Sequence, residues 1–598
     1  MNRRFLPPAL LAVTALCAVL TFGCSEDDDP TGPPPPAPPT VGGVSETVVS
    51  PGDTLVITGS NFVSPASSNT VTFTNPLGTS KPFAGSSTSL SVIVDQDATT
   101  GPVRVSHAGG SSAGPSVEVR RGIGDFFVFG GLGANNVLAL PNPTATTRYL
   151  VVPHATNAGL PYTSEVGYAI DSETAVPVAA TQTAAAALRA AEATGVGLQE
   201  AFEAWRWEQT RELVDGRGVP PRPTRRSAPA TPQAPQVTRQ FYVLKTTTGS
   251  VTNPASFQRV TAELRYDGAR CLVYSDVDTL ATGNFDGSHY RTIGEAFDNG
   301  IEATNVQYFG GYSDVDGNGK AIILSTPVVN RLTPGGSGGF IAGFFLSVDL
   351  YSPPAIPSGI SNEAEIFYLL AADPAAQWGN TFPVQFTLDT NISTTAHEHE
   401  HMISFSHRIF NEGGVTQTTW LEEGMAHMAE DLNSLDVDNQ KRTAIYMGNP
   451  GAISLEHNTA PLSQRGGIYL FLRLMADRYG TDILKEIVQS RCAGRACVQE
   501  VTGRDFYDLV AEFLAALYLS DRGVTADPRF NYTSIDLADF GTLVTPLRAA
   551  GGGLVAGDIR KSSGDFYMFT GALNTESRFT FTDEIGNARL RNVIVRVQ

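Results

Sequence analysis

The chain has 598 residues, 41% of them hydrophobic and 9% aromatic, and its formal net charge is −19 at pH 7. A single hydrophobic core does not extend to this size, so we expect roughly three to five domains. The acidic balance argues against a nucleic acid or an anionic membrane surface as a partner, but it does not identify a substrate.

The N-terminus carries an export signal. Two arginines at positions 3 and 4 precede an apolar run over 5–22, and Gly23-Cys24 follows at once. Such a run is typical of a signal peptide rather than a permanent membrane span. Gly23-Cys24 resembles a bacterial lipobox, which implies that Cys24 becomes the lipidated first residue. A plainly secreted form or a retained anchor is the alternative.

We therefore assign 1–24 to a signal peptide of the lipoprotein type and 25–40, which is acidic and then proline-rich, to a stiff tether. The only expected link to a membrane is the lipid at Cys24. Ser25 does not resemble an inner-membrane retention signal, so we expect an exported protein at the outer membrane, at the cell surface or outside the cell.

Residues 41–120 alternate apolar and polar side chains in runs separated by turn residues. The clearest runs are 54–59, 69–73, 89–94 and 101–106. A period of two with regular turns predicts a small antiparallel sandwich. The stretch PGDTLVITGSNF at 51–62 resembles an immunoglobulin-like IPT/TIG module, which implies a spacer or a binding unit.

Residues 121–215 combine strands with a helical stretch. The clearest strands are 125–129 and 148–153, and 182–215 predicts one or two helices. We expect the stretch around Trp205 and Trp207 to be an amphipathic helix packed on its own domain, with a protein-contact face as the alternative.

A proline-rich, basic segment at 216–237 predicts a linker. Its Arg225-Arg226 pair is a candidate cleavage site directly before the region that carries the chemistry. We therefore keep the hypothesis that 121–215 acts partly as a propeptide.

Residues 238–395 predict alternating strands and loops, with 320–325 and 364–370 the clearest strands. Helical patterns follow at 392–409, 420–434, 466–479, 482–490 and 503–520. The tail over 526–598 returns to strands, including 564–569 and 592–597. The expected fold is multidomain, with an all-β sandwich, an α+β domain at 238–525 that ends in a helical subdomain, and a small β region.

The sequence His397-Glu398-His399-Glu400-His401 contains a His-Glu-x-x-His pattern. Residues four apart share one face of a helix, so His397 and His401 are able to hold one zinc ion. Glu398 is then placed to act as general base on a metal-bound water. Ser393 or Thr394 is the expected N-cap of this helix. A solvated helix face or an opportunistic metal-binding patch is the alternative.

A second segment, Trp420-Leu421-Glu422-Glu423-Gly424, resembles the helix that supplies the third zinc ligand in gluzincin metallopeptidases. Glu423 stands at the matching position, and Glu422 is the fallback. The resemblance is closest to hyicolysin-type bacterial metallopeptidases and extends over roughly 238–525. It implies a zincin fold, zinc bound by His397, His401 and Glu423, and hydrolysis of proteins or peptides with Glu398 as base.

Two further side chains are candidates for the catalytic set. His427 lies one turn after Glu423, where it would orient that carboxylate or bind the oxyanion, although an ordinary half-buried histidine fits equally well. Tyr469 is a candidate oxyanion donor, although tyrosines packed on helices usually belong to a core.

Three neighbouring patterns resemble other metal sites or a disulfide. A metzincin register ending at His407 needs a glycine where Ser404 stands, and His399 lies on the opposite side of the helix. The run from Asp314 to Gly319 resembles the start of a calcium loop, but Ser325 replaces the expected glutamate, so a tight turn is favoured and calcium is a second possibility. A local disulfide between Cys492 and Cys497 is slightly favoured over two free thiols.

The main competing class is a non-catalytic surface adhesin with a structural or degenerate metal site. The presence of both ligands and base argues against it, because a degenerate site often loses the glutamate.

Overall fold

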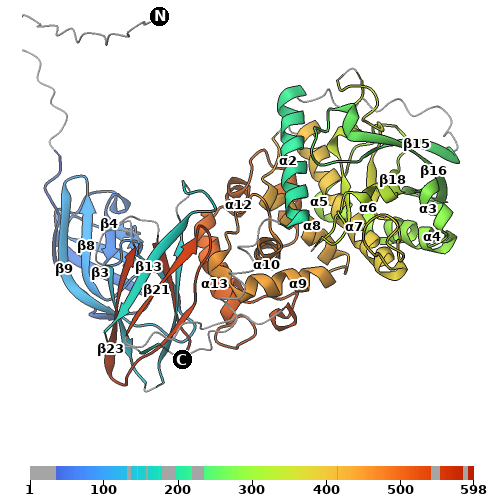
Figure 1. The fold of residues 1–598 in the computed structure, drawn as a ribbon. Coiled ribbons are helices and arrows are strands. Elements are labelled where there is room, and N and C mark those ends of the chain that lie inside the picture. The colour runs from blue at the N-terminus through green and yellow to red at the C-terminus, as the bar shows by residue number, and fades with distance from the viewer. Residues whose placement is uncertain are drawn as a thin grey trace, which may run out of the picture.

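The computed structural model describes residues 35–598 except 131–135, 145, 157–158, 174–175, 178–196, 218–234, 338, 354, 412, 414, 541–552 and 584–589. The signal peptide, most of the tether, the start of the helical pattern at 182–215 and the Arg225-Arg226 pair lie outside these residues. Among the described helices, none is both long and apolar enough to cross a membrane. Figure 1 shows two β domains at one end of the molecule, helices in the middle, and a mixed α/β region at the other end.

The N-terminal domain is a two-sheet sandwich, as the alternating pattern predicts. One sheet has the order β1-β3-β7-β6 and the other β2-β9-β8-β4-β5, with the apolar side chains of both facing one core. The strands are β1 (Thr40–Val44), β2 (Val48–Val49), β3 (Thr54–Ser60), β4 (Thr70–Phe73), β5 (Thr79–Ser80), β6 (Ala84–Gly85), β7 (Ser89–Ile93), β8 (Gly101–His107) and β9 (Gly110–Val119). The IPT/TIG assignment stays a prediction.

A second sandwich joins strands from two distant parts of the chain. Its sheets have the orders β10-β24-β12-β22-β14 and β11-β23-β13-β21. The strands are β10 (Phe126–Phe129), β11 (Asn136–Asn142), β12 (Arg148–Ala155), β13 (Glu165–Ser172), β14 (Val176–Pro177), β21 (Leu554–Arg560), β22 (Tyr567–Thr570), β23 (Thr575–Asp583) and β24 (Leu590–Arg596). The division into 121–215 and 526–598 therefore separates two halves of one domain.

A six-stranded mixed sheet follows, with the order β15-β16-β17-β18-β20-β19. Strand β18 is parallel to both neighbours, whereas β19 forms an antiparallel edge. The strands are β15 (Thr238–Leu244), β16 (Phe257–Asp267), β17 (Cys271–Asp276), β18 (Ala321–Ser325), β19 (Gly343–Phe345) and β20 (Ile366–Leu369).

Helices between these strands correct the expectation of strands and loops alone. They are α3 (Val277–Thr282), α4 (Gly287–Ala296), the π-helix η3 (Phe297–Ile301), α5 (Glu302–Phe309) and α6 (Pro327–Arg331). Asp276 and Asp286 cap α3 and α4 by accepting from backbone N–H groups of the first turn. Glycines inside this polar stretch weaken its helical pattern, so the caps are the better signal.

Seven helices and one π-helix build the helical region and its junction with the sheet. They are α7 (Val384–Phe405), the π-helix η5 (Ser406–Asn411), α8 (Thr419–Leu432), α9 (Val437–Gly448), α10 (Leu462–Tyr479), α11 (Asp482–Gln489), α12 (Arg495–Thr502) and α13 (Phe506–Leu519). Short 3-10 turns complete the described elements: η1 (Ala66–Ser68), η2 (Pro254–Ser256), η4 (Ser347–Leu350), η6 (Pro450–Ala452), η7 (Pro528–Phe530) and η8 (Leu537–Phe540).

Helix α7 begins at Val384, so the expected start near Ser393 or Thr394 is wrong. Earlier hydroxyl side chains bond back to the helix itself: Thr387 Oγ1 donates to the carbonyl of Pro383 at 2.9 Å. This bonding within the helix lets polar residues continue it rather than cap it.

The expected disulfide is also wrong, because Cys492 and Cys497 are free. Both thiols contact the hydroxyl of Ser490, at 3.2 and 3.1 Å.

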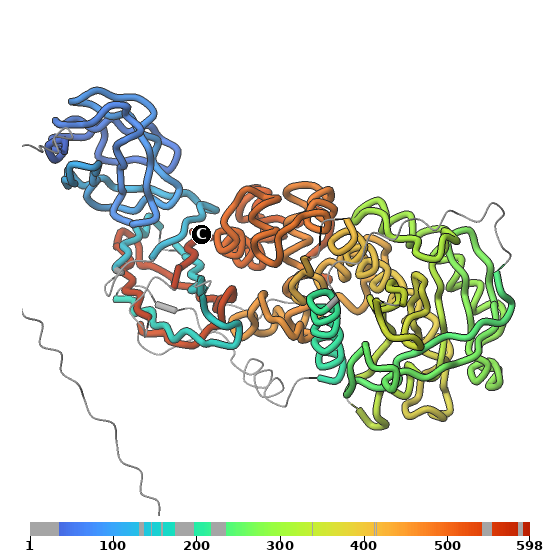
Figure 2. Tube along the Cα trace, turned by 90° about the horizontal axis from the view of Figure 1, so that it is seen from above, coloured from blue at the N-terminus to red at the C-terminus, as the bar shows by residue number. Residues whose placement is uncertain are grey.

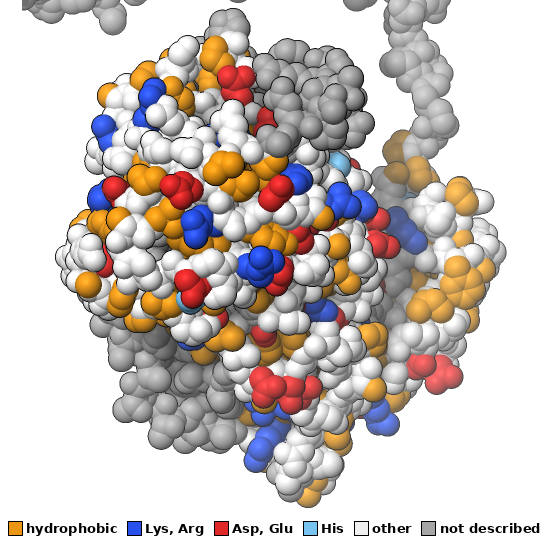
Figure 3. Space-filling model, turned by 90° about the vertical axis from the view of Figure 1, so that its right-hand side faces the viewer, with side chains coloured by type: hydrophobic (Ala, Val, Ile, Leu, Met, Phe, Trp, Pro, Cys, Tyr) orange, Lys and Arg blue, Asp and Glu red, His pale blue; other side chains and the backbone are white. Residues whose placement is uncertain are grey.

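Helix α2 (Leu198–Arg217) confirms the described part of the helical pattern at 182–215. It does not pack on the β domain that precedes it. Its apolar residues Phe202, Leu213 and Val214 join the core of the mixed sheet, and Figures 1 and 2 show it standing between that sheet and the helical region. The outer face of the mixed region intersperses acidic, basic and apolar side chains (Figure 3).

Candidate metal centre

Helices α7 and α8 bring two histidines and one glutamate together. Nε2 of His397 lies 3.5 Å from Oε2 of Glu423, and Nε2 of His401 lies 3.6 Å from Oε1 of the same carboxylate. Two ligands bonded to zinc at about 2.1 Å with tetrahedral angles lie about 3.4 Å apart. Each histidine nitrogen is therefore at the spacing of a second zinc ligand from Glu423, and the two distances end on different oxygens of that carboxylate.

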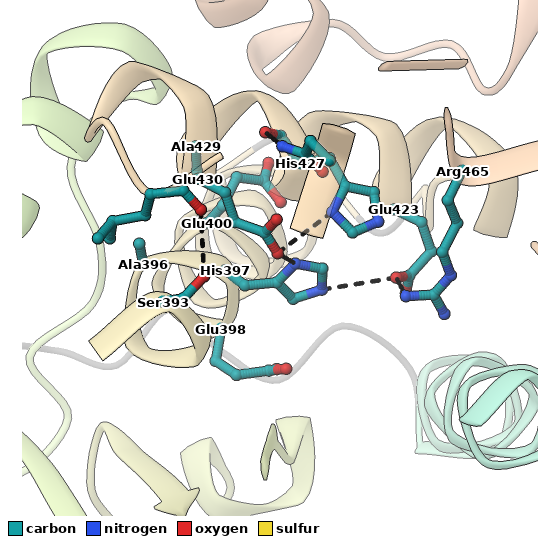
Figure 4. Close-up of polar contacts among 12 residues, drawn as sticks. Ser393, Ala396, His397, Glu398, Glu400, Glu423, His427, Ala429, Glu430 and Arg465 are labelled. Atoms are coloured by element: carbon teal, nitrogen blue, oxygen red, sulfur yellow. Dashed lines mark hydrogen bonds and ion pairs between the residues drawn. The ribbon is translucent and has the colours of Figure 1, made fainter. Parts of the chain in front are cut away.

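The other ring nitrogen of each histidine faces carboxylates. Nδ1 of His397 donates to Oε1 of Glu430 at 2.8 Å, which leaves its Nε2 directed at Glu423 (Figure 4). Nδ1 of His401 faces Glu400 at 3.3 Å and Glu422 at 3.7 Å. The hydrogen bond from His397 to Glu430 is of the kind that fixes the orientation of a metal-binding imidazole, whereas Nδ1 of His401 has no hydrogen-bond partner among the described residues.

Glu422, the fallback ligand, lies near the other ring nitrogen of His401 from Glu423. It faces the Nδ1 side of His401, and its Oε2 accepts a hydrogen bond from Ser404 at 2.9 Å. Glu423 alone of the two lies between the Nε2 atoms of the histidines.

The side chains of the centre are buried. His401 and Glu423 are fully buried, and Nε2 of His401 has no hydrogen-bond partner among the described residues. A buried imidazole nitrogen without a partner is costly unless an ion or a proton satisfies it. The donor set of two imidazoles and one carboxylate is one that zinc prefers, so the residues fit that metal.

Electrostatics at His397 favour a cation, whereas burial and then Arg206 hold the pKa of His401 well below its ordinary value. Burial lowers the pKa of His397, but contacts with Glu423 and Glu430 outweigh it and raise the pKa to about 10. Burial opposes ionisation of Glu423, yet Arg465, whose Nη1 lies 2.9 Å from Oε2, leads the contacts that hold its pKa well below the usual range. The surroundings that favour a proton on His397 also favour a divalent ion beside it.

Glu398 is held next to the ligands. Its Oε2 accepts from the backbone N–H of Phe345 on the edge strand β19 at 2.8 Å, and burial raises its pKa to about 7. Ligand atoms of His397, Glu398 and His401 all lie within 4.8 Å of one another. The expected base and both histidines are therefore together.

No family model matches the chain. A curated protein, the neutral metalloprotease ShpI of Staphylococcus hyicus, is 30% identical over 248 residues, which are 39% of this chain and 51% of that protein. The chain thus spans about half the length of this curated relative. The similarity points to a metalloprotease. The histidine and glutamate clusters agree with it, because they are able to hold a metal ion.

Similar solved structures cover small parts of the chain. A Bacteroides thetaiotaomicron protein of unknown function is 15% identical over 21% of this chain and 31% of its own, with a TM-score of 0.14. An auxiliary nutrient binding protein from the same species is 16% identical over 22% and 26%, with a TM-score of 0.13. SGBP-B from a Bacteroides uniformis xyloglucan utilization locus is 15% identical over 23% and 52%, with a TM-score of 0.12. Scores this low carry no argument about fold or function.

A cavity of about 340 Å³ opens beside the candidate metalloprotease centre. Its wall includes His397, Glu398 and Arg465, together with Gly343, which begins the edge strand, and Gly339, which precedes it. It therefore places open space next to the expected base and one expected ligand.

His427 lies beside this centre, and Tyr469 packs further along the helical core. The His427 ring lies 5.0 Å from that of His397, and its Nδ1 lies 3.2 Å from Glu430. The Tyr469 ring stacks on Phe540 at 6.0 Å. The oxyanion roles of both residues stay predictions.

The rival registers find no support. Helix α7 continues through Ser404 without a turn, and His407 lies on η5 with Asn411 as a partner at 3.3 Å. His399 points into an aromatic cluster, 4.7 Å from Tyr312 and 5.0 Å from Phe297.

The Asp314 loop gathers a different acid from the expected one. Ligand oxygens of Asp314, Asp316 and Glu365 lie within 4.8 Å of one another. Glu365 follows the loop by many residues, so the spacing rule that led to Ser325 could not find it. Calcium at this loop stays a prediction.

Sequence reasoning missed the contribution of α2. Nε1 of Trp207 donates to Oε1 of Glu423 at 2.8 Å, and its ring meets His401 edge-on at 5.1 Å. The guanidinium of Arg206 lies 3.4 Å from Glu423 and 3.8 Å from Glu398. A predicted helix rich in charged residues, directly before a linker, was the available signal.

Proposed function

We propose that the chain is a zinc endopeptidase of the zincin fold, with His397, His401 and Glu423 as ligands. The observation that carries the proposal is the placement of both Nε2 atoms at 3.5 and 3.6 Å from one carboxylate. When bound, zinc supplies a water of lowered pKa and polarises the substrate carbonyl.

The chain's own groups account for proton transfer and orientation. Glu398 takes the proton of the attacking water and passes it to the leaving amine. The N–H of Phe345 fixes the carboxylate of Glu398 while that transfer occurs. Glu430 keeps Nε2 of His397 facing the ion by accepting from the Nδ1 of the same ring.

The proposed setting is outside the cytoplasm, with protein or peptide substrates. It is supported by the sequence of residues 1–40, whose apolar run, Gly23-Cys24 and proline-rich stretch resemble a lipoprotein signal followed by a tether. A lipid at Cys24 would hold the enzyme at a membrane surface while the N-terminal sandwich separates it from that surface.

The substitution Glu398→Gln tests the function. We expect the wild type to cleave casein in a chelator-sensitive manner. The variant should lose about 100- to 10,000-fold in rate while it retains zinc and fold, because only proton transfer is removed. Glu486→Gln, the same change at an exposed site on α11, is the matched control.

A wild type that retains zinc but cleaves neither casein nor a broad peptide pool would contradict the proposal and favour a surface adhesin with a structural metal site. Metal content, measured on the same samples, separates loss of chemistry from loss of the ion.

A further inference from the structure

Helix α2 lies over the candidate centre and contacts both the expected base and an expected ligand. The Arg206 guanidinium spans them, with Nη1 3.8 Å from Glu398 and Nη2 3.4 Å from Glu423. Both Arg206 and Trp207 are buried in this position. The side chains of α2 therefore reach the atoms that the reaction would use.

The position of Arg206 conflicts with peptide hydrolysis. The attacking water and the substrate carbonyl must lie between the metal ligands and the base, within about 3 Å of each. A guanidinium that contacts Glu398 and Glu423 takes up the part of that space on the α2 side, opposite the cavity beside His397. It also places a positive charge next to the position of a divalent ion and competes for the same carboxylate oxygen.

The same helix covers the edge of the mixed sheet beside the centre. Phe202 packs against Phe344 of β19, with ring centroids 5.5 Å apart, and Thr210 meets Ser347 just beyond that strand at 3.2 Å. An extended peptide is able to add to a sheet beside its edge strand. Helix α2 thus lies along the strand that carries the contact to Glu398.

Two polar contacts add to the apolar packing that attaches α2. Gln209 accepts from the N–H of Val251 at 3.1 Å, and Glu200 accepts from the N–H of Leu462 at 3.3 Å. The described sheets contain no strand from α2, so its departure would break no strand pairing.

We propose that α2 is an inhibitory segment, in which Arg206 and Trp207 close the metal centre until the helix moves away. The inference rests on the proposed function. It narrows the propeptide hypothesis from 121–215 to α2, because strands β10 to β14 pair with the C-terminal strands and belong to the second sandwich. Cleavage in the linker would then release one end of α2 and leave that sandwich intact.

A reversible lock tests the inference most sharply. The hydroxyls of Thr210 and Ser347 already lie 3.2 Å apart, so the double variant Thr210→Cys/Ser347→Cys is designed to tie α2 to the sheet domain when oxidised. We expect the oxidised protein to cleave casein and to lose zinc to a chelator about 10-fold or more slowly than the reduced protein, since opening precedes both events. The two single-cysteine variants, treated with the same oxidant, control for the native thiols.

A loosened variant supplies the opposite change. Arg206→Ala/Trp207→Ala removes the contacts with the centre and should accelerate both casein cleavage and zinc extraction by about 10-fold or more. The exposed Glu208→Ala on the same helix is the matched control and should behave as the wild type.

Two results together would overturn the inference. The oxidised and reduced double-cysteine proteins would cleave casein and lose zinc at equal rates, and Arg206→Ala/Trp207→Ala would fold but be no faster than the wild type. Helix α2 would then be a fixed part of the domain. Zinc content separates this failure from failure of the proposed function. A protein that holds zinc and shows equal extraction rates contradicts only the closure, whereas a protein that binds no zinc contradicts the peptidase and the closure together.

Discussion

The core of the second sandwich and the metal centre are both buried, but the first is apolar and the second is rich in charged side chains. The sandwich core is apolar and aromatic, as in the pair Phe569 and Phe579 with centroids 5.0 Å apart. Between α7 and α8, the acids Glu400, Glu422 and Glu430 are buried beside the ligands. Apolar burial stabilises a fold, whereas a buried carboxylate costs several kcal/mol unless it is paired.

The difference indicates that stability and chemistry are carried by separate parts of the chain. Changes in the sandwich should alter the free energy of unfolding and leave zinc alone. Changes at the centre should alter zinc binding first. The variants below test whether stability and zinc binding change independently.

Phe569→Ala should have the largest effect. The side chain is fully buried between the two sheets of the second sandwich, so its removal should cost about 3–5 kcal/mol in the free energy of unfolding of that domain. Urea unfolding measures the loss. Zinc affinity under native conditions should stay at the wild-type value, and a parallel loss of zinc would show that the two regions are coupled.

His401→Ala should lower zinc affinity by about 1,000-fold, since one of three protein ligands in a site worth roughly 10–16 kcal/mol is removed. The matched control is His399→Ala on the same helix, which removes a buried ring among Phe297 and Tyr312. It should reduce stability but keep zinc. Competition with a chromogenic chelator measures both, and equal zinc loss in the two variants would contradict the assignment.

Glu430→Gln should weaken zinc binding by about 10- to 100-fold, because the carboxylate that holds Nδ1 of His397 loses its charge. At saturating zinc, the rate of peptide cleavage should recover. Asp438→Asn, an exposed acid on the neighbouring α9, is the control and should leave affinity unchanged. A variant with wild-type affinity would remove Glu430 from the orientation of His397.

His154 is a polar side chain within the sandwich and breaks its apolar pattern. Burial lowers its pKa to about 3, with Arg591 adding to the effect, and its ring nitrogens have no hydrogen-bond partner among the described residues. The folded state binds the proton less tightly than the unfolded state. The stabilisation that comes from a neutral His154 is therefore fully present above the unfolded pKa of about 6.5. It is lost as the pH falls from there toward the folded pKa of about 3.

At pH 5.5 this linkage should cost about 1.4 kcal/mol relative to pH 8. Urea unfolding of the wild type and of His154→Phe at both pH values measures it. Between pH 8 and pH 5.5, the free energy of unfolding of His154→Phe should fall by about 1.4 kcal/mol less than that of the wild type. An equal fall in both proteins would exclude His154 as the titrating group.

Local spacing was sufficient to predict that His397, Glu398 and His401 lie together on one helix. His397 and His401 are four residues apart on one continuous helix, and Glu398 lies beside them as that spacing requires. The prediction of Glu423 depended on a family resemblance, because no rule of spacing pairs α7 with α8.

Long-range contacts could not be predicted. The bond from Trp207 to Glu423 joins residues 216 positions apart, and Asn142 of β11 bonds Ser577 of β23 across 435 positions. A period of two identifies a strand but not its partner, so the strands of the second sandwich were assigned to two regions. The start of α7 at Val384 was not predicted, because the hydroxyl of Thr387 bonds within the helix instead of marking its first residue.

The location of bound zinc tests the central claim most directly. Anomalous diffraction at the zinc edge from crystals of the zinc-loaded protein should show one peak within about 2.1 Å of Nε2 of His397, Nε2 of His401 and an oxygen of Glu423. A peak between His427 and Glu430 on the Nδ1 side of His397, or no peak at this centre, would contradict the account.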